Sequence, residues 1–257
     1  MKAGSMLRIS TALLLLTCCL GPRDIRADDP YAGLNWFDKT NAAFVPPHKW
    51  MRRHEWLKRH ESFVDIARQD NFDLLFIGDS LTDFWRTRGK SVWERNFGPL
   101  KAENFGISGD RTQNVFWRVQ HGELNGTHPK LVVLLIGTDN SESDPAEDIA
   151  KGITAVVKEI RARCPATKVL VLAIFPRADT PDATERDKIS QKIRDTNKII
   201  ASLDDGTSIK YLDIGPKFAD SSGALQKSVM PDLLHPNDKG YQIWADAILP
   251  TVKAMMR

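Results

Sequence analysis

Ser80, Asp232 and His235 are residue types that could carry out nucleophilic catalysis. Ser80 follows the apolar run Phe76-Ile77-Gly78-Asp79, on a turn between an expected strand and helix. Asp232 and His235 stand three residues apart, just before the last expected helix. A carboxylate at this spacing can bond the imidazole and fix its tautomer while the other ring nitrogen takes a proton from a serine. A helix-capping serine and a surface Asp–His pair are the alternatives, and these residues alone do not decide between them.

The elements that would position these residues alternate along the chain. Apolar runs predict strands at 74–77, 103–105, 131–136, 169–175 and 209–214, and amphipathic patterns predict helices at 48–69, 149–160, 189–203 and 241–248. We expect Asp144 to cap the second helix, with Pro145 in its first turn. Wholly apolar strands separated by helices predict an α/β fold, a three-layer α/β/α sandwich around a parallel five-stranded sheet. Its ligand should lie at the carboxyl ends of the strands.

The first expected helix carries an apolar face and three histidines. Its apolar residues are Trp50, Trp56, Leu57, Phe63 and Val64. His48, His54 and His60 are spaced by six residues, which turns each about 240° from the last on a helix. They cannot converge on one metal ion, so we expect all three on the solvated face. His121 and His128 lie near no acidic or cysteine cluster of metal-ligand spacing, so no metal site is expected.

Residues 1–27 have the pattern of a signal peptide. Lys2 and Arg8 precede an apolar stretch at 9–20 that is too short to span a bilayer. We expect a secreted or periplasmic protein; a lipid anchor on Cys19 is the less favoured alternative. Residues 28–47 then form an irregular N-terminal arm, and residues 48–257 form a single domain.

Charge and cysteine content narrow the function classes. The leader holds four of the 36 basic and one of the 33 acidic residues, so the mature chain would carry 32 of each. A balanced charge gives no support for nucleic acid or an anionic membrane as a partner. Cys164 is the only cysteine after the leader, which excludes an internal disulfide and implies stability from a full-sized core.

Four sequence blocks match a known family. They are Gly78-Asp79-Ser80-Leu81, Asn104-Phe105-Gly106-Ile107-Ser108-Gly109-Asp110, Gly137-Thr138 and Asp232-Leu233-Leu234-His235. In this order they resemble the SGNH, or GDSL-type, hydrolases over roughly residues 45–250, and within that family the catalytic subunits of intracellular platelet-activating-factor acetylhydrolase. The resemblance implies a flavodoxin-like fold, an ester substrate and no cofactor.

The resemblance also implies a role for each matched residue. Ser80 would attack the ester carbonyl, His235 would act as general base and then general acid, and Asp232 would orient His235. The backbone N–H groups of Ser80 and Gly109 would hold the oxyanion, and a glycine at 109 lets the backbone approach the substrate closely.

The match fails at Asp139, where the family keeps an asparagine whose amide donates a further hydrogen bond to the oxyanion. An ionised carboxylate has no proton to donate. Three interpretations compete. Asn140 supplies the amide through a turn after Thr138; or Asp139 is protonated, favoured by burial and by Glu142 and Asp144; or the enzyme is weakened or inactive.

These observations predict a secreted serine esterase that removes short acyl groups, acetyl above all, from a carbohydrate. An esterase acting on lipids is the enzymatic alternative, and a noncatalytic binding protein is the alternative from another class. The resembled subunits form pairs, so a homodimer is an open alternative. We expect most of the seven tryptophans to lie in the core rather than on a sugar-stacking surface.

Overall fold

The structure is a computed structural model that describes residue 49 and residues 51–257. The expected leader and arm, together with His48 and Trp50, lie outside the described residues. The strands are β1 (Leu74–Gly78), β2 (Ala102–Gly106), β3 (Leu131–Leu135), β4 (Lys168–Leu172) and β5 (Ile209–Leu212). All neighbouring strands are parallel, in the order β2-β1-β3-β4-β5. The predicted parallel five-stranded sheet is therefore confirmed.

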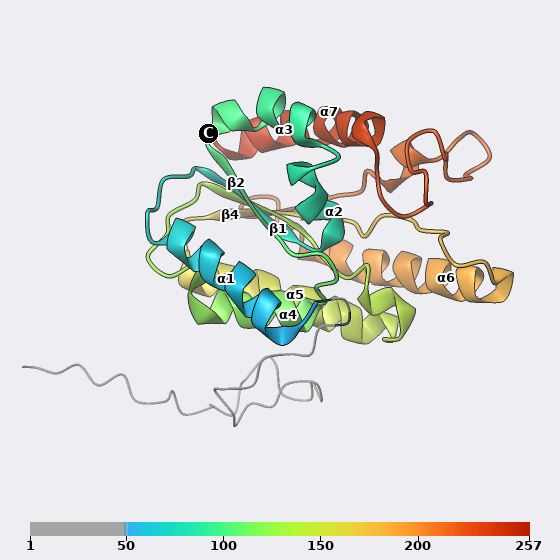
Figure 1. Ribbon diagram of the computed structural model, residues 1–257, viewed down its shortest axis with the longest axis horizontal. Helices are drawn as coiled ribbons and strands as arrows, with labels where there is room; N and C mark the ends of the chain where they lie inside the picture. Colours follow the sequence, from blue (N-terminus) through green and yellow to red (C-terminus); the bar gives the residue numbers. More distant parts are fainter. Residues whose placement is uncertain (1–48, 50) are drawn as a thin grey trace, which may run out of the picture. The chain divides into compact units, whose positions relative to one another are not determined.

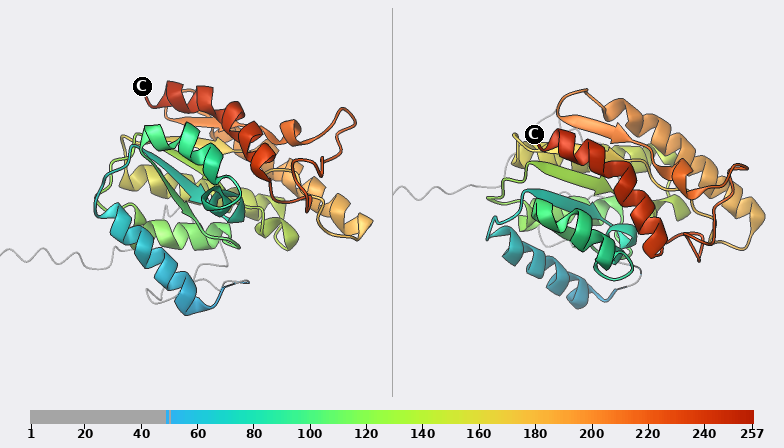
Figure 2. Two further views of the ribbon diagram at one scale, coloured as in Figure 1. Left: turned by 45° about the horizontal axis from the view of Figure 1, so that its top comes forward. Right: turned by 90° about the horizontal axis from the view of Figure 1, so that it is seen from above.

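Helices cover both faces of this sheet. They are α1 (Arg53–Ala67), α2 (Ser80–Asp83), α3 (Lys90–Asn96), α4 (Thr112–Arg118), α5 (Ala146–Arg163), α6 (Ala183–Ile200) and α7 (Asp238–Met255). Figure 1 shows α3 and α7 on one face and α1, α4, α5 and α6 on the other. The two further views show α3 and α7 side by side over the strands (Figure 2). This is the expected three-layer α/β/α sandwich.

The core explains why the strands are apolar throughout. Every residue of β1 and β3 is buried, because each strand has helices on both of its faces. Beneath α7, Phe76 of β1 packs edge-on against Trp85, whose ring also contacts Tyr241 and Trp244. Of the five tryptophans among the described residues, Trp56, Trp85 and Trp244 are buried and two are half-buried. The prediction that most tryptophans belong to the core holds for these five.

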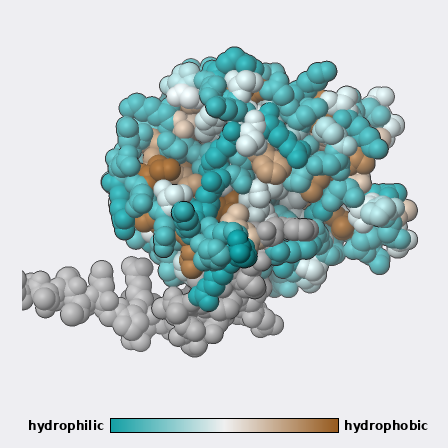
Figure 3. Space-filling model, in the orientation of Figure 1, coloured by the Kyte–Doolittle hydropathy of each residue, from teal (hydrophilic) through white to brown (hydrophobic). Residues whose placement is uncertain are grey.

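The surface is predominantly polar. The face in Figure 3 is mostly hydrophilic, with small and separate hydrophobic patches. Among the described residues, Ile199 is the one large hydrophobic side chain that is exposed. None of the helices in this part of the chain has the length and apolar character needed to cross a membrane.

The first helix differs from its expected form. It spans Arg53–Ala67 rather than 48–69, and its buried side is made of Trp56, His60, Phe63 and Ala67. His54 is exposed as expected, but the expectation for His60 was wrong because this side chain is buried. Its Nδ1 lies 3.0 Å from a carboxylate oxygen of Glu123, a buried partner 63 residues away that helix periodicity could not reveal.

The expected cap of α5 was also wrong. The helix begins at Ala146 after an extended Pro145, and no side chain caps it. The carboxylate of Asp144 instead accepts hydrogen bonds from Arg111, at 3.1 Å, and from the amide of Asn140, at 2.6 Å. Asp144 therefore ties two loops together rather than capping a helix.

Candidate active site

Three loops meet at the carboxyl edge of the sheet. The parallel register sets Gly78 of β1 beside Gly106 of β2 and Leu135 of β3, so the segments after these strands leave the sheet at one level. Gly78 is required there because a Cβ atom would overlap the carbonyl oxygen of Leu135 and the side chain of Thr82. The close approach brings the first and third sequence blocks together.

Ser80, His235 and Asp232 form a continuous hydrogen-bonded chain. Ser80 Oγ lies 3.0 Å from His235 Nε2, and His235 Nδ1 lies 2.9 Å from Asp232 Oδ2. Ser80 is buried, at the first residue of α2, whereas Asp232 is exposed. Residues 155 positions apart are thus brought within hydrogen-bond distance by the fold.

The loop that carries Asp232 is held by its own backbone. Asp232 Oδ1 accepts the backbone N–H groups of Leu234, at 3.1 Å, and of His235, at 2.7 Å. Leu233 between them adopts a left-handed conformation with φ of 57°, and its carbonyl accepts a hydrogen bond from the N–H of Ala178. This geometry fixes the carboxylate against the imidazole.

The charge of Asp232 determines the tautomer of His235. Burial opposes ionisation of Asp232, but hydrogen bonds from the backbone and ring of His235 and from the N–H of Leu234 outweigh it and lower the pKa to about 2. An ionised Asp232 can only accept, so Nδ1 of His235 carries the proton that it donates. Nε2 is then free to accept the hydroxyl proton of Ser80, as a general base requires.

Gly109 lies on the loop after β2, which Asp83 holds in place. The carboxylate of Asp83 accepts the hydroxyl of Ser108, at 2.7 Å, and its backbone N–H, at 3.2 Å. It also pairs with Arg59, at 2.8 Å, and Arg86, at 2.5 Å. Gly109 has φ of 86°, a left-handed conformation that glycine adopts without strain.

Asp139 and Asn140 have different environments. The structure does contain a turn after Thr138. The side chain of Asn140 is buried, however, and is already engaged in hydrogen bonds: its oxygen accepts the N–H of Thr112, and its nitrogen donates to Gln113 and Asp144. Asp139 instead lines a cleft of about 400 Å³ together with Gly109. The turn therefore leaves Asp139, not Asn140, beside Gly109.

Three residues near the site were not identified from the sequence. Asp83 supports the Gly109 loop, and the ring of Phe84 packs 5.0 Å from that of His235. Arg177, which is buried, donates to the carbonyl of Thr138 and pairs with Asp179 and Glu142. Arg177 follows β4, and a search of the residues just after each strand could have identified it, since ligands bind at the carboxyl ends of the strands.

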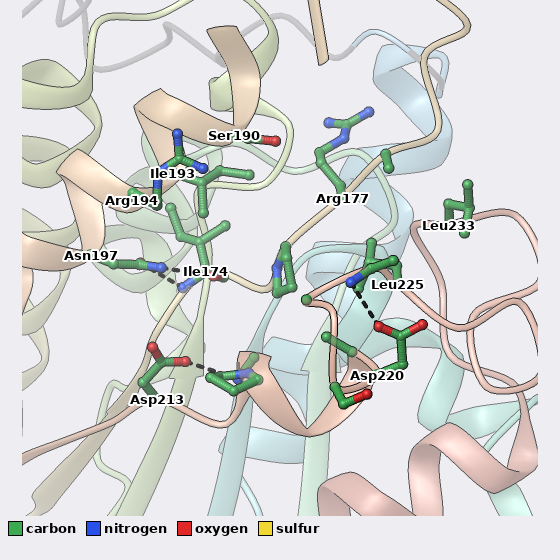
Figure 4. Close-up of a pocket in the computed structure, with 18 residues that line it drawn as sticks. Ile174, Arg177, Ser190, Ile193, Arg194, Asn197, Asp213, Asp220, Leu225 and Leu233 are labelled. Atoms are coloured by element: carbon green, nitrogen blue, oxygen red, sulfur yellow. Dashed lines mark hydrogen bonds between the residues drawn. The ribbon is translucent and has the colours of Figure 1, made fainter. Parts of the chain in front are cut away.

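A larger cavity of about 730 Å³ lies beyond the carboxyl ends of β4 and β5. Leu233 and Arg177 line it, which connects it to the loops of the site (Figure 4). Most of its polar side chains are already bonded to the backbone, as Asn197 is to Ile174 and Asp220 is to Ala224. The remaining wall is largely apolar.

Within residue 49 and residues 51–257, no three His, Cys, Asp or Glu side chains are grouped so as to hold a metal ion. His121 Nδ1 donates to the carbonyl of Trp117, and His128 pairs with Asp70 at 2.8 Å.

A serine, a histidine and a carboxylate in hydrogen-bonded sequence at the carboxyl edge of a parallel α/β sheet define the class of α/β serine hydrolases. Residues 76–243 match the GDSL-like Lipase/Acylhydrolase family. The chain is also 37% identical over 180 residues to platelet-activating factor acetylhydrolase IB subunit alpha2 of Rattus norvegicus, covering 70% of this chain and 75% of that protein. The chain therefore belongs to the GDSL-like, or SGNH, hydrolase family, whose members hydrolyse carboxylic esters.

Solved structures share the fold of this chain. A GDSL-like lipase from Bacteroides thetaiotaomicron superposes with a TM-score of 0.64 at 20% identity, over 77% of this chain and 97% of the other. A carbohydrate acetylesterase from Sinorhizobium meliloti superposes with a TM-score of 0.57 at 18% identity, over 72% of this chain and 99% of the other. At these identities the likeness shows the fold alone.

Proposed function

We propose that this chain is a secreted serine esterase that removes short acyl groups, acetyl above all, from a carbohydrate ester. The observation that carries the esterase proposal is the Ser80–His235–Asp232 chain of hydrogen bonds. Ser80 Oγ attacks the ester carbonyl as its proton passes to His235 Nε2, and His235 returns that proton to the leaving alkoxide. Water then repeats the two steps on the acyl-enzyme. The backbone N–H groups of Ser80 and Gly109 stabilise the oxyanion.

The character of the cleft supports a short acyl group. Six residues line the cleft of about 400 Å³. One is Gly109, and the other five are charged or polar, namely Lys49, Arg111, Asp139, Glu142 and Ser143. This cleft is smaller than the other cavity and offers less apolar surface, so a long alkyl chain would bury little there, whereas an acetyl group needs no such surface. The relative named an acetylhydrolase and the fold neighbour named a carbohydrate acetylesterase agree with this choice. Export rests on the leader pattern of residues 1–27.

The larger cavity favours a second candidate, an ester with an apolar leaving group such as a lipid. Its wall is largely apolar, and Leu233 places it next to the loop of His235. In that case the acyl group remains short and the leaving group occupies the cavity.

The test is hydrolysis of matched acetyl esters. An acetylated xylooligosaccharide, a choline-lipid acetyl ester, para-nitrophenyl acetate and para-nitrophenyl octanoate are compared by kcat/KM. We expect kcat/KM to be higher for para-nitrophenyl acetate than for para-nitrophenyl octanoate. We also expect it to be higher for the acetylated xylooligosaccharide than for the choline-lipid acetyl ester. The reverse ranking of the last two would select the lipid candidate.

A fluorophosphonate probe tests the nucleophile independently. We expect Ser80 to be labelled, and the Ser80→Ala variant to lose labelling and nearly all hydrolysis. Ser62→Ala, which changes an exposed serine on α1, is the matched control and should remain active. A folded protein whose Ser80 stays unlabelled would be a noncatalytic binding protein instead.

A further inference from the structure

Asp139 stands where the family keeps its oxyanion-binding amide, and the fold leaves no substitute for it. Gly78 of β1 pairs with Leu135 of β3, and beyond this pair Asp79 interacts with Thr138 and Asp139. Asp139 faces the same cleft as Gly109, the residue proposed to hold the oxyanion with its N–H. The side chain at 139 is therefore the one in place to act on the oxyanion.

Asn140 cannot take over this role in the structure. Both protons of its amide have acceptors, Gln113 at 3.2 Å and Asp144 at 2.6 Å, and its oxygen holds the first N–H of α4. Turning this side chain toward Ser80 would take the partner from the buried N–H of Thr112 and would break both bonds to Gln113 and Asp144.

The carboxyl group of Asp139 is poorly supported as an anion. Among the described residues, none donates a hydrogen bond to it. Arg177 is nearby, but its Nε and Nη2 donate to Asp179 and Glu142 and its Nη1 donates to the carbonyl of Thr138. A half-buried carboxylate without donors favours its neutral form.

Asp79 provides a second carboxyl group beside Asp139. It is fully buried; its Oδ1 accepts the N–H of Leu81, while its Oδ2 has no hydrogen-bond partner in the described part of the chain. The hydroxyl of Thr138, also buried, has no other partner there and interacts with this carboxyl group, which lowers the pKa of Asp79 by less than burial raises it. Burial, and then the charge of Asp139, raises the pKa of Asp79 well above its usual range. A fully buried carboxyl group and a half-buried one that interact electrostatically are costly to ionise together at neutral pH.

We propose that the Asp79–Asp139 pair keeps a proton at neutral pH and that Asp139 presents it as an O–H donor to the oxyanion, in place of the family's amide. The proposal rests on the esterase function proposed above. When the bond between Ser80 Oγ and the carbonyl carbon forms, the π electrons move to the carbonyl oxygen and the serine proton moves to His235. The oxyanion then accepts a hydrogen bond from Asp139, which keeps its proton. The developing negative charge itself favours the proton on Asp139 over Asp79.

Charged groups from several elements act on Asp139. Burial raises its pKa, Arg177 beyond β4 lowers it, Glu142 on the same turn raises it, and His235 and Lys49 lower it; the net direction is upward. The charge of Asp139 in turn raises the pKa of Asp79 after β1. Because the active form is protonated, activity must fall as pH rises through the pKa of Asp139, whereas an asparagine at 139 would donate at any pH.

The experiment is a pH profile of kcat/KM on para-nitrophenyl acetate from about pH 5 to about pH 9. The full-length protein is compared with Asp139→Asn, Asp139→Ala and Glu142→Gln. We expect the wild type to lose activity on the alkaline side and Asp139→Asn to keep it. Asp139→Ala should lose on the order of a hundredfold at the optimum, since it removes one oxyanion donor. Glu142→Gln is the matched carboxyl control. Its activity should still fall on the alkaline side, but at a lower pH, because Glu142 no longer raises the pKa of Asp139.

Two results would overturn this role. One is an Asp139→Ala variant as active as the wild type or more so, which would mean that an ionised Asp139 only impairs the site. The other is the same alkaline profile in the wild type and Asp139→Asn. Failure of the esterase proposal looks different, because then neither the wild type nor Asp139→Asn hydrolyses the ester at any pH and Ser80 is not labelled by the fluorophosphonate.

Discussion

At the scale of single residues, Asp232 determines what His235 can do. It is exposed, yet three hydrogen bonds fix its position relative to the imidazole. Its pKa of about 2 means that the carboxylate stays ionised until strongly acid pH, so it should not cause the acid limb of the rate profile. Because its pKa is lowered on folding, ionised Asp232 adds to the free energy of unfolding. This contribution is fully present at pH values above the ordinary pKa of 3.8 and is lost as the pH falls toward 2.

Replacing Asp232 by asparagine should lower kcat by roughly a thousandfold or more while the protein stays folded, because an amide can hold the imidazole in the wrong tautomer. The measurement is kcat on para-nitrophenyl acetate, with circular dichroism as a check of folding. Asp238→Asn, an exposed acid in the first turn of α7, is the control. If Asp232→Asn kept more than about a tenth of the wild-type rate, the orienting role would be wrong.

At the scale of elements, a buried polar cluster anchors α1 to the Gly109 loop. Trp56 Nε1 of α1 donates to Asp110, at 2.7 Å, and Arg118 of α4 donates to the other oxygen of Asp110, at 2.8 Å. Arg118 also pairs with Glu123, at 2.5 Å, which in turn contacts His60 of α1. Asp110 is the residue after Gly109. The packing of α1 against this cluster therefore helps to hold the Gly109 loop in place.

This cluster predicts how stability depends on pH. Burial raises the pKa of Asp110 to about 7, against the opposing effects of Arg118 and Trp56. A pKa raised above the unfolded value means that the native state keeps a proton that the unfolded chain releases, so stability falls between about pH 4 and about pH 7. Urea midpoints across this range should therefore decline less in Asp110→Asn than in the wild type.

Asp246→Asn, an exposed acid on α7, should follow the wild-type slope. Equal slopes for Asp110→Asn and the wild type would show that Asp110 is ionised throughout and that Arg118 compensates its burial fully.

At the scale of the whole molecule, no disulfide links the elements of the sandwich within residue 49 and residues 51–257. Cys164 at the end of α5 is buried, with its thiol 3.4 Å from the carbonyl of Thr127. Burial raises the pKa of this thiol, which leaves little of the reactive thiolate. Its chemical modification should therefore report on opening of the core.

We expect iodoacetamide to spare Cys164 in native buffer and to modify it in denaturant, as followed by mass spectrometry of the peptide that contains it. An added cysteine at an exposed site, Ser202→Cys, provides the reference for a freely reacting thiol. Modification of Cys164 at that reference rate under native conditions would contradict a closed core around α5.

The sequence determined the parts of this protein that depend on local pattern. Strands that are apolar at every position, such as 131–135, predict a sheet covered on both faces, and the structure confirms it. Ser80 was selected because it follows an expected strand, at the edge of the sheet where ligands bind. Asp232 and His235 were selected because a carboxylate three residues before a histidine can bond its imidazole. The departure at Asp139 was also visible in the sequence, because it is a change of residue type within a motif.

Only the tertiary structure decided which side chains meet across long separations. The order of the strands, the burial of His60 against Glu123 and the proximity of Arg177 to Asp139 depend on packing between distant segments. The choice between Asp139 and Asn140 was undecidable from their adjacent positions. In the structure, hydrogen bonds with Thr112, Gln113 and Asp144 occupy the amide of Asn140 and leave Asp139 facing the cleft, because a buried polar group must keep its partners.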